Sequence, residues 1–199
     1  MEFFQKAKYV RLRSQHGKYL WADDDRQSVS QRRDGAKQNA KWKVEVVEGS
    51  SLVRLKSCYD CYLTASSILF LLGTTGRKVL QTIPLEYESF IEWKPIRDGY
   101  RAKLKIQNGS YLRANPGLPP WRNSVTHDIP HRTVTRDWIL WEVEITEIFI
   151  PPSSVMLKPV PSTTKSQPNC DDQLIYCIGD KNGMVEKDNA GSDNIIIKP

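Results

Sequence analysis

The chain has 199 residues, of which 39% are apolar and 26% charged, and its formal net charge is +6. The longest apolar run spans only residues 68–72, far short of the ~20 residues that a membrane-spanning helix needs, so we expect no membrane contact. The first six residues lack the basic-then-apolar order of a secretion signal. We therefore expect a cytoplasmic protein, with the nucleus as a further compartment.

Three segments of the first 150 residues repeat one pattern of alternating apolar and basic residues, then a turn pair, then Tyr-Leu. The repeated leucines are Leu12, Leu55 and Leu104, and the repeated pairs are Tyr19-Leu20, Tyr62-Leu63 and Tyr111-Leu112. Each copy closes on a tryptophan, at Trp42, Trp93 and Trp141. Alternation with period two predicts strands with one buried face, and the large tryptophan side chains are expected in the core.

The turn pairs predict three tight hairpins. Asn108-Gly109 and His16-Gly17 suit a type I′ turn, in which both central residues need positive φ. Tyr59-Asp60 fits that turn less well, so we expect a different turn type in the second copy. Arg32-Arg33-Asp34-Gly35 is expected at the tip of the first repeat's hairpin, where Gly35 allows positive φ.

Many short strands, turn signals between them and no amphipathic helix pattern predict an all-β protein. Three repeats are too few for a propeller, which has at least ~4 blades, and favour a β-trefoil, a closed barrel capped by three hairpins. We assign residues 1–149 to this domain. Residues 150–168 have the Pro, Ser and Thr content of a linker, and residues 169–199 are interpreted as a poorly ordered fragment of a second domain.

Basic residues alternate with the buried positions of the first strand of each repeat. These candidate partner-binding residues are Arg11, Arg13, Arg54, Lys56, Lys103 and Lys105. Residues 1–150 hold 24 Lys and Arg against 17 Asp and Glu, so acidic partners such as actin, nucleic acid, phosphoinositides or sulfated glycans are favoured. The alternative is that these residues form only the solvated face of the barrel.

The segment 121–136 departs most from the repeat and is expected to replace the hairpin of the third copy. It adds four candidate partner-binding residues, Arg122, His127, His131 and Arg132. Irregular loops on rigid scaffolds often carry binding sites. The alternative is that Trp121 plugs the barrel and the two histidines satisfy buried backbone groups.

No catalytic motif is found, so we do not expect an enzyme. Cys58 and Cys61 have CxxC spacing, but no second such pair accompanies them, and a cytoplasmic chain keeps its thiols reduced. We predict neither a metal nor a cofactor. Aromatic residues that belong to the core cannot stack on bases, which argues against nucleic acid as the partner.

Five segments of the chain resemble a plant family of fascin-like proteins of unknown function that is often labelled actin cross-linking. They are Glu2-Phe3-Phe4, Val10 to Ser14, Arg54 to Tyr59, Pro119 to Thr133 and Trp138 to Val143. The resemblance implies a β-trefoil and actin-filament binding over residues 1–148. Cross-linking would require a second site or a dimer. Two alternatives remain: a lectin-like trefoil, although the Gln-x-Trp signature of ricin-type lectins is missing, or a stress or developmental protein with another protein partner.

Overall fold

The computed structural model describes residues 2–73, 76–84, 89–129 and 133–150, which lie in one compact unit within Met1–Val155. The predicted linker, apart from Ile150, and the predicted fragment at 169–199 lie outside the described residues. No helix in the described part of the chain is long and apolar enough to cross a membrane.

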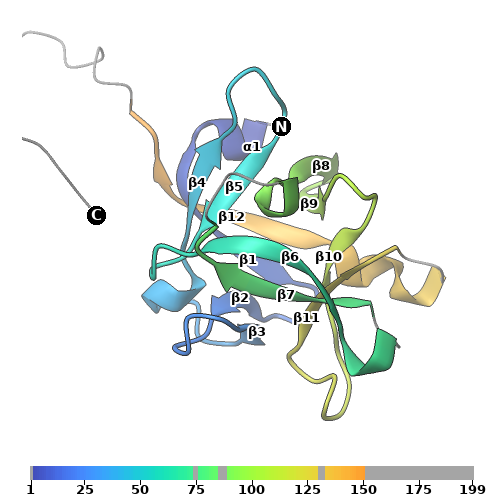
Figure 1. Ribbon diagram of the computed structural model, residues 1–199. Coiled ribbons are helices and arrows are strands. Elements are labelled where there is room, and N and C mark those ends of the chain that lie inside the picture. Colours follow the sequence, from blue (N-terminus) through green and yellow to red (C-terminus); the bar gives the residue numbers. More distant parts are fainter. Residues whose placement is uncertain (1, 74–75, 85–88, 130–132, 151–199) are drawn as a thin grey trace, which may run out of the picture. The chain divides into compact units, whose positions relative to one another are not determined.

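Each repeat contributes four strands to the fold (Figure 1). The first repeat comprises β1 (Ala7–Ser14), β2 (Tyr19–Ala22), β3 (Val29–Arg32) and β4 (Trp42–Val46). The second comprises β5 (Val53–Lys56), β6 (Tyr62–Leu69), β7 (Arg77–Thr82) and β8 (Lys94–Asp98). The third comprises β9 (Arg101–Lys105), β10 (Tyr111–Ala114), β11 (Val125–Asp128) and β12 (Trp141–Ile148). The helices are short: α1 (Glu2–Gln5) and the 3₁₀ turns η1 (Gln38–Ala40), η2 (Leu71–Gly73), η3 (Ser89–Ile91) and η4 (Thr133–Ile139).

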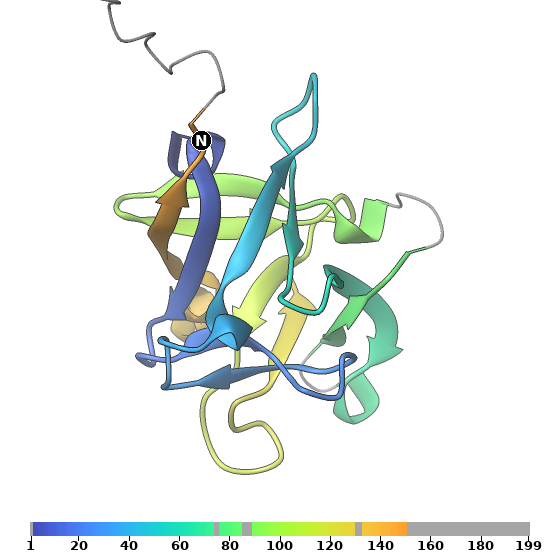
Figure 2. The same ribbon diagram turned by 90° about the vertical axis from the view of Figure 1, so that its left-hand side faces the viewer.

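Strand pairing runs from β12 through β9, β10, β11, β7, β6, β5 and β4 to β1, and β1 pairs with β12 again. The barrel thus closes and has no free edge along this path. β8 pairs with β9, and Val53 and Trp93 exchange two backbone hydrogen bonds of 2.8 and 2.9 Å that join β5 to the start of β8. The hairpins β2–β3, β6–β7 and β10–β11 gather at the end away from the N-terminus (Figure 2). This threefold arrangement is a β-trefoil, as predicted.

The core repeats the same hydrogen bond three times. The tryptophans Trp42, Trp93 and Trp141 are fully buried. Their indole Nε1 groups donate to the backbone carbonyls of Leu20, Leu63 and Leu112, at 3.2, 2.9 and 3.0 Å. Each indole therefore fills the core and ties the closing strand of its repeat to the cap hairpin, which explains why Trp and Tyr-Leu recur together.

The three tight turns are alike, so the expectation of a different turn in the second copy is wrong. Gly17, Asp60 and Gly109 have positive φ, at 69°, 61° and 91°. In each copy the backbone carbonyl of the residue that opens the turn accepts a hydrogen bond from the N–H of the positive-φ residue. The N–H of the opening residue donates in turn to the carbonyl of the residue that follows the positive-φ residue. Only one residue of each pair has positive φ, so the turn is a three-residue loop rather than type I′. Asp60 fits because aspartate tolerates the left-handed region.

Two further expectations about hairpins are also wrong. The third repeat keeps its hairpin, because β10 and β11 pair over four residues on either side of loop 115–124. The described part of segment 121–136 contributes the end of this loop, all of β11 and the start of η4. In the first repeat the tip lies at residues 23–28, where Asp25 Oδ1 accepts the backbone N–H groups of Gln27 and Ser28. Arg33 therefore follows β3 instead of capping the hairpin.

A ring of buried polar side chains joins the three hairpins. Gln31, Gln81 and His127 occupy equivalent positions, opposite Leu20, Leu63 and Leu112. Gln31 Nε2 donates to the carbonyls of residues 115 and 124, at 3.1 and 2.9 Å. Gln81 Nε2 donates to those of residues 23 and 28, at 2.8 and 3.0 Å. Each glutamine thus holds the loop of a neighbouring repeat.

The third member of the ring differs from the other two. Ser14 and Ser57 donate to the Oε1 atoms of Gln31 and Gln81, at 3.0 and 2.9 Å, but Ile106 takes the serine position in the third repeat. His127 Nε2 lies 2.8 Å from the carbonyl of Ser66, so Nε2 carries the proton because a carbonyl only accepts. His127 Nδ1 is buried and has no hydrogen-bond partner among the described residues.

Candidate functional site

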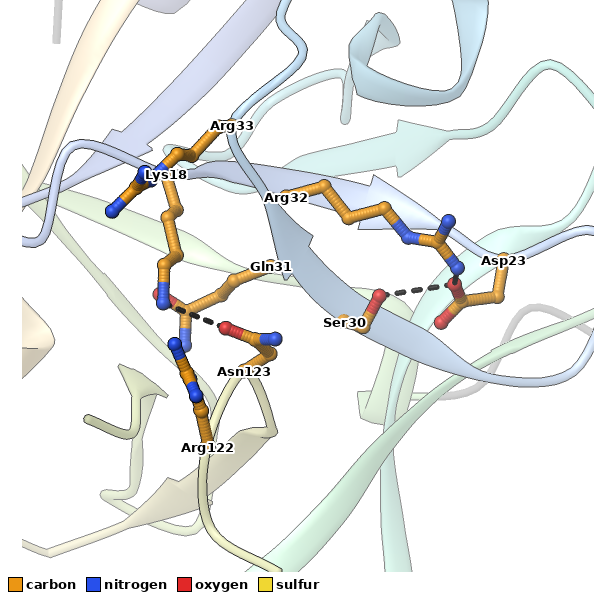
Figure 3. A pocket seen from close by; sticks show the side chains of 8 residues that line it. All are labelled: Lys18, Asp23, Ser30, Gln31, Arg32, Arg33, Arg122 and Asn123. Atoms are coloured by element: carbon orange, nitrogen blue, oxygen red, sulfur yellow. Dashed lines mark hydrogen bonds and ion pairs between the residues drawn. The ribbon is translucent and has the colours of Figure 1, made fainter. Parts of the chain in front are cut away.

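A solvent-open hollow of about 770 Å³ lies where β3 meets loop 115–124 (Figure 3). We call it the cation pocket. Its described lining residues are Lys18, Asp23, Ser30, Gln31, Arg32, Arg33, Arg122 and Asn123. They include four cations and one carboxylate, so the lining carries a formal charge of +3. The first and third repeats build the pocket together.

Three cations come from three separate segments. Lys18 closes the first tight turn, where its carbonyl accepts the Ser14 N–H at 2.7 Å. Arg33 follows β3 directly. Arg122 belongs to loop 115–124, and its N–H donates to the carbonyl of Leu118 at 3.1 Å. In Figure 3 these three side chains lie on one side of the pocket, with Arg122 pointing toward Lys18.

None of the three cations is ion-paired with a carboxylate in the described part of the chain. Lys18 Nζ donates to the Oδ1 atom of Asn123 at 2.6 Å, a neutral acceptor. Arg33 and Arg122 are exposed and form no ion pair with any described residue. Burial, followed by the charges of Arg122 and Arg33, lowers the pKa of Lys18. The electrostatic repulsion within this group favours the entry of an anion.

The other side of the pocket is internally paired. Arg32 forms an ion pair with Asp23 at 2.7 Å, and its guanidinium lies over the ring of Trp21, 5.2 Å from the centroid. Ser30 Oγ donates to the same Asp23 carboxylate at 3.0 Å. This group orders the wall of the pocket and leaves the unpaired charge on Lys18, Arg33 and Arg122.

The floor of the cation pocket is fixed by the buried ring. Gln31 is 1% exposed, and its backbone N–H donates to the carbonyl of Asn123 at 2.8 Å. Ser30 and Ser124 form a further antiparallel bridge. The loop that carries Arg122 is therefore attached to β3 by both backbone and side-chain hydrogen bonds, which preorganises the cations for a ligand.

Most of the predicted barrel cations have partners within the domain. Their ion pairs are Arg13–Glu142 at 3.8 Å, Arg54–Glu92, Lys56–Asp60 at 3.0 Å and Lys103–Asp98 at 2.5 Å. Lys105 Nζ lies over the ring of Tyr111, 5.7 Å from the centroid. Arg11 is opposite Glu144 in the β1–β12 ladder. A partner would have to compete with these contacts, so the barrel face offers less unpaired charge than the cation pocket.

The predicted residues of segment 121–136 separate in the structure. Arg122 lines the cation pocket. His127 is only 3% exposed and holds the carbonyl of Ser66, which is the structural alternative considered for it. Burial lowers its pKa. His131 and Arg132 lie outside the described residues.

Sequence reasoning missed Lys18 and Arg33. A comparison of the repeats contained the signal, because strand pairing aligns Lys18 with Cys61 and Ser110, and Arg33 with Ile83 and Ile129. These two positions are cationic in the first copy and uncharged in the other two. A departure from an internal repeat is an indication of function that periodicity alone does not provide.

The two cysteines in the described part of the chain are free, with Cys58 exposed and Cys61 buried. Burial raises the pKa of both thiols, which disfavours the reactive thiolate. No three His, Cys, Asp or Glu side chains are grouped as metal ligands within the described ranges.

The family model of the Beta-trefoil domain of unknown function (DUF569) matches residues 1–141. The chain belongs to this family. Nothing among the curated proteins matches the chain. Membership in DUF569 agrees with the trefoil described above and assigns no ligand.

Solved structures show the same fold at low sequence identity. The designed threefold-symmetric protein ThreeFoil is 18% identical, with a TM-score of 0.56, over 68% of this chain and 97% of its own. The SDF2-like protein from Arabidopsis thaliana is 13% identical, with a TM-score of 0.55, over 70% and 93%. A Polyporus squamosus lectin bound to the epitope Neu5Aca2-6Galb1-4GlcNAc is 14% identical, with a TM-score of 0.53, over 70% and 49%. At these identities the likeness establishes the trefoil fold of this DUF569 chain and no more.

Proposed function

We propose that this trefoil is a non-catalytic binding module that recognises an acidic surface of a protein partner through the cation pocket. The observation that carries the proposal is the group Lys18, Arg33 and Arg122, which lines one hollow and forms no ion pair with a described residue, whereas most of the barrel cations are ion-paired. Unpaired surface cations steer and orient acidic partners. The expected location remains the cytoplasm.

Actin filaments are the partner to test first, because they are acidic and the resemblance to fascin-like proteins implies them. The proposed contact differs from the one expected from sequence: it uses the cation pocket and not the paired residues of the barrel. One cation pocket is sufficient for binding to a filament. Bundling would need a second site or a dimer.

A glycan is the second candidate partner. A structurally similar lectin is bound to a sialylated epitope, and a sugar carboxylate would suit the cation pocket. However, none of the described lining residues is aromatic, so the pocket lacks the stacking surface that sugar rings commonly use. Binding of a sialylated trisaccharide but not its neutral counterpart would favour this candidate over a protein partner.

The test is co-sedimentation of the full chain with filamentous actin across a range of salt concentrations. We expect saturable pelleting at low salt that declines as salt screens the charges. The variant R33E/R122E reverses two charges in the pocket, and K37E/K78E makes the same charge change at exposed positions outside it. Loss of pelleting only in R33E/R122E supports the proposal.

Two outcomes contradict it. If the unaltered chain does not pellet at low salt, actin is not the partner. If both double variants lose pelleting equally, general basic charge and not the cation pocket mediates the contact. Because all four residues are exposed, thermal unfolding should show that both variants remain folded.

A further inference from the structure

The three unpaired cations of the pocket differ in what they offer an anion. Arg33 and Arg122 each present a planar guanidinium fork, which matches two oxygens of an oxyanion, while Lys18 supplies a compact charge. Lys18 is half-buried and already oriented by Asn123 Oδ1 at 2.6 Å. In Figure 3, Arg122 points toward Lys18, and the Arg33 side chain extends outward on the same side of the pocket. Because Arg33 is exposed, its guanidinium is free to turn toward an anion that the other two hold.

The number of charges distinguishes the possible acidic groups. A carboxylate carries one negative charge and two oxygens, so it would leave most of the +3 formal charge of the lining uncompensated. A phosphate monoester carries about −1.5 to −2 near pH 7 and three acceptor oxygens. It therefore compensates more of this charge than a carboxylate does, and it offers one acceptor oxygen to each of the three cations.

The shape of the pocket is consistent with a group attached to a larger molecule. The hollow of about 770 Å³ is open to solvent and much larger than a phosphate, so the chain that bears the group can enter with it. On the far wall, Asp23 Oδ1 is occupied by Arg32 and Ser30, which keeps this carboxylate from facing the anion alone. Arginine clusters in rigid pockets are a recurring means of recognising phosphorylated segments.

We infer that the cation pocket binds the phosphate monoester of a phosphorylated side chain on the partner protein, with Arg33 and Arg122 as the forks and Lys18 as the third contact. This inference rests on the proposed function and specifies the chemistry of the partner. It makes recognition conditional on modification of the partner.

The test is a titration of the ¹⁵N-labelled full chain, followed by NMR, with N-acetyl-O-phosphoserine N-methylamide and with the analogous blocked glutamate and serine. We expect phosphoserine to shift the signals of Lys18, Arg33, Arg122 and Asn123 and to bind at least about fivefold more tightly than glutamate, since one additional charge acts near a screened surface. The serine compound should not bind. R33Q/R122Q should weaken phosphoserine binding at least about tenfold, while K37Q/K78Q leaves it unchanged.

Three results would overturn the inference: equal affinity for phosphoserine and glutamate, unchanged binding in R33Q/R122Q, or tighter binding of a heparin-derived sulfated disaccharide in the same pocket. The last would assign the site to a sulfated glycan. Failure here is distinct from failure of the proposed function. Actin pelleting that depends on Arg33 and Arg122 without phosphoserine binding would keep the acidic protein partner and remove the phosphate.

Discussion

At two junctions of the trefoil, a buried glutamine of one repeat holds a loop of another repeat. The buried contacts of the two junctions are alike, and their solvent-facing residues differ. At the first, Gln31 holds loop 115–124, and at the second, Gln81 holds loop 23–28. In both, the backbone N–H of the glutamine donates to the adjoining loop, at 2.8 and 2.9 Å. On the outside, however, Lys18 and Arg33 of the first junction correspond to a buried Cys61 and an exposed Ile83 at the second.

The comparison separates the residues that build the fold from those that give it a ligand. The tryptophans recur in all three repeats because each fills the same part of the core. The buried glutamines and their serine donors recur in the first two repeats, where both junctions must satisfy the same polar groups. The outer positions carry no such requirement, so they can differ without cost to the fold. The binding site is therefore sought where the repeats differ on the surface.

The largest expected effect would disrupt what both junctions share. Replacing Trp42 or Trp93 by alanine should lower the free energy of unfolding by about 3–5 kcal/mol, because each change empties a fully buried site and removes the hydrogen bond to a leucine carbonyl. Replacement by phenylalanine should cost less, since most of the packing remains. Urea unfolding measures both, and a loss below about 1 kcal/mol for either alanine variant would contradict the account.

A matched pair of substitutions should then separate stability from binding. Gln31→Ala and Gln81→Ala each remove the acceptor of a buried serine hydroxyl and a side-chain donor to two backbone carbonyls, so each should cost about 2–4 kcal/mol of unfolding free energy. Only Gln31→Ala should also weaken phosphate binding, because it releases the loop that carries Arg122. Equal effects of both variants on phosphate affinity would refute the distinction between the two junctions.

The third member of the ring gives a pH-dependent prediction. Burial, aided by nearby Arg77 and opposed by the hydrogen bond to Ser66 and by Asp128, holds the pKa of His127 below the ordinary value of 6.5. Below that pH the unfolded chain takes up a proton that the folded chain does not, so the free energy of unfolding should fall as the pH is lowered, until the folded pKa is passed. His127→Gln copies the residue of the other repeats and should reduce this loss.

The control for this prediction is His16, whose pKa is also lowered, mainly by burial. The contribution of His16 to the acid sensitivity should remain in the His127→Gln variant and should be lost in the His16→Gln variant. Urea unfolding at a series of pH values from neutral to acidic compares the variants. A profile for His127→Gln that matches the unaltered chain would show that His127 is not responsible for the acid sensitivity.

The smallest effect on stability should come from the outer positions. Arg33→Ile copies the second junction and should change the unfolding free energy by no more than about 0.5 kcal/mol, because Arg33 is exposed and without an ion pair among the described residues. The same substitution should weaken phosphate binding severalfold. Thermal unfolding and phosphate titration of one sample measure both. A large loss of stability would mean that Arg33 supports the fold.

The repeated leucines, tryptophans and turn pairs were sufficient to predict the trefoil, because a core that is built three times leaves a period in the sequence. The turn type and the ends of the hairpins were not predictable in the same way. Asp60 adopts the conformation of Gly17 and Gly109 because the surrounding strands require it, and local preference did not indicate this.

The candidate site was predicted only in part. Arg122 was identified from its irregular loop, but its partners Lys18 and Arg33 are distant in sequence and meet it only because Gln31 attaches that loop to β3. The barrel cations were conspicuous in sequence because they alternate with core residues. Their carboxylate partners lie mainly on other strands or in turns, so their neutralisation could not be read from the alternation.

The most direct measurement is the titration of the ¹⁵N-labelled chain with inorganic phosphate, in which the signals of the equivalent positions in the three repeats are compared in one experiment. The account predicts shifts at Lys18, Arg33, Arg122 and Asn123, and none of comparable size at Cys61, Ile83, Ser110 or Ile129. Shifts of similar size at the equivalent positions of all three repeats, or shifts concentrated on the barrel cations, would contradict the claim that the first junction is the anion-binding site.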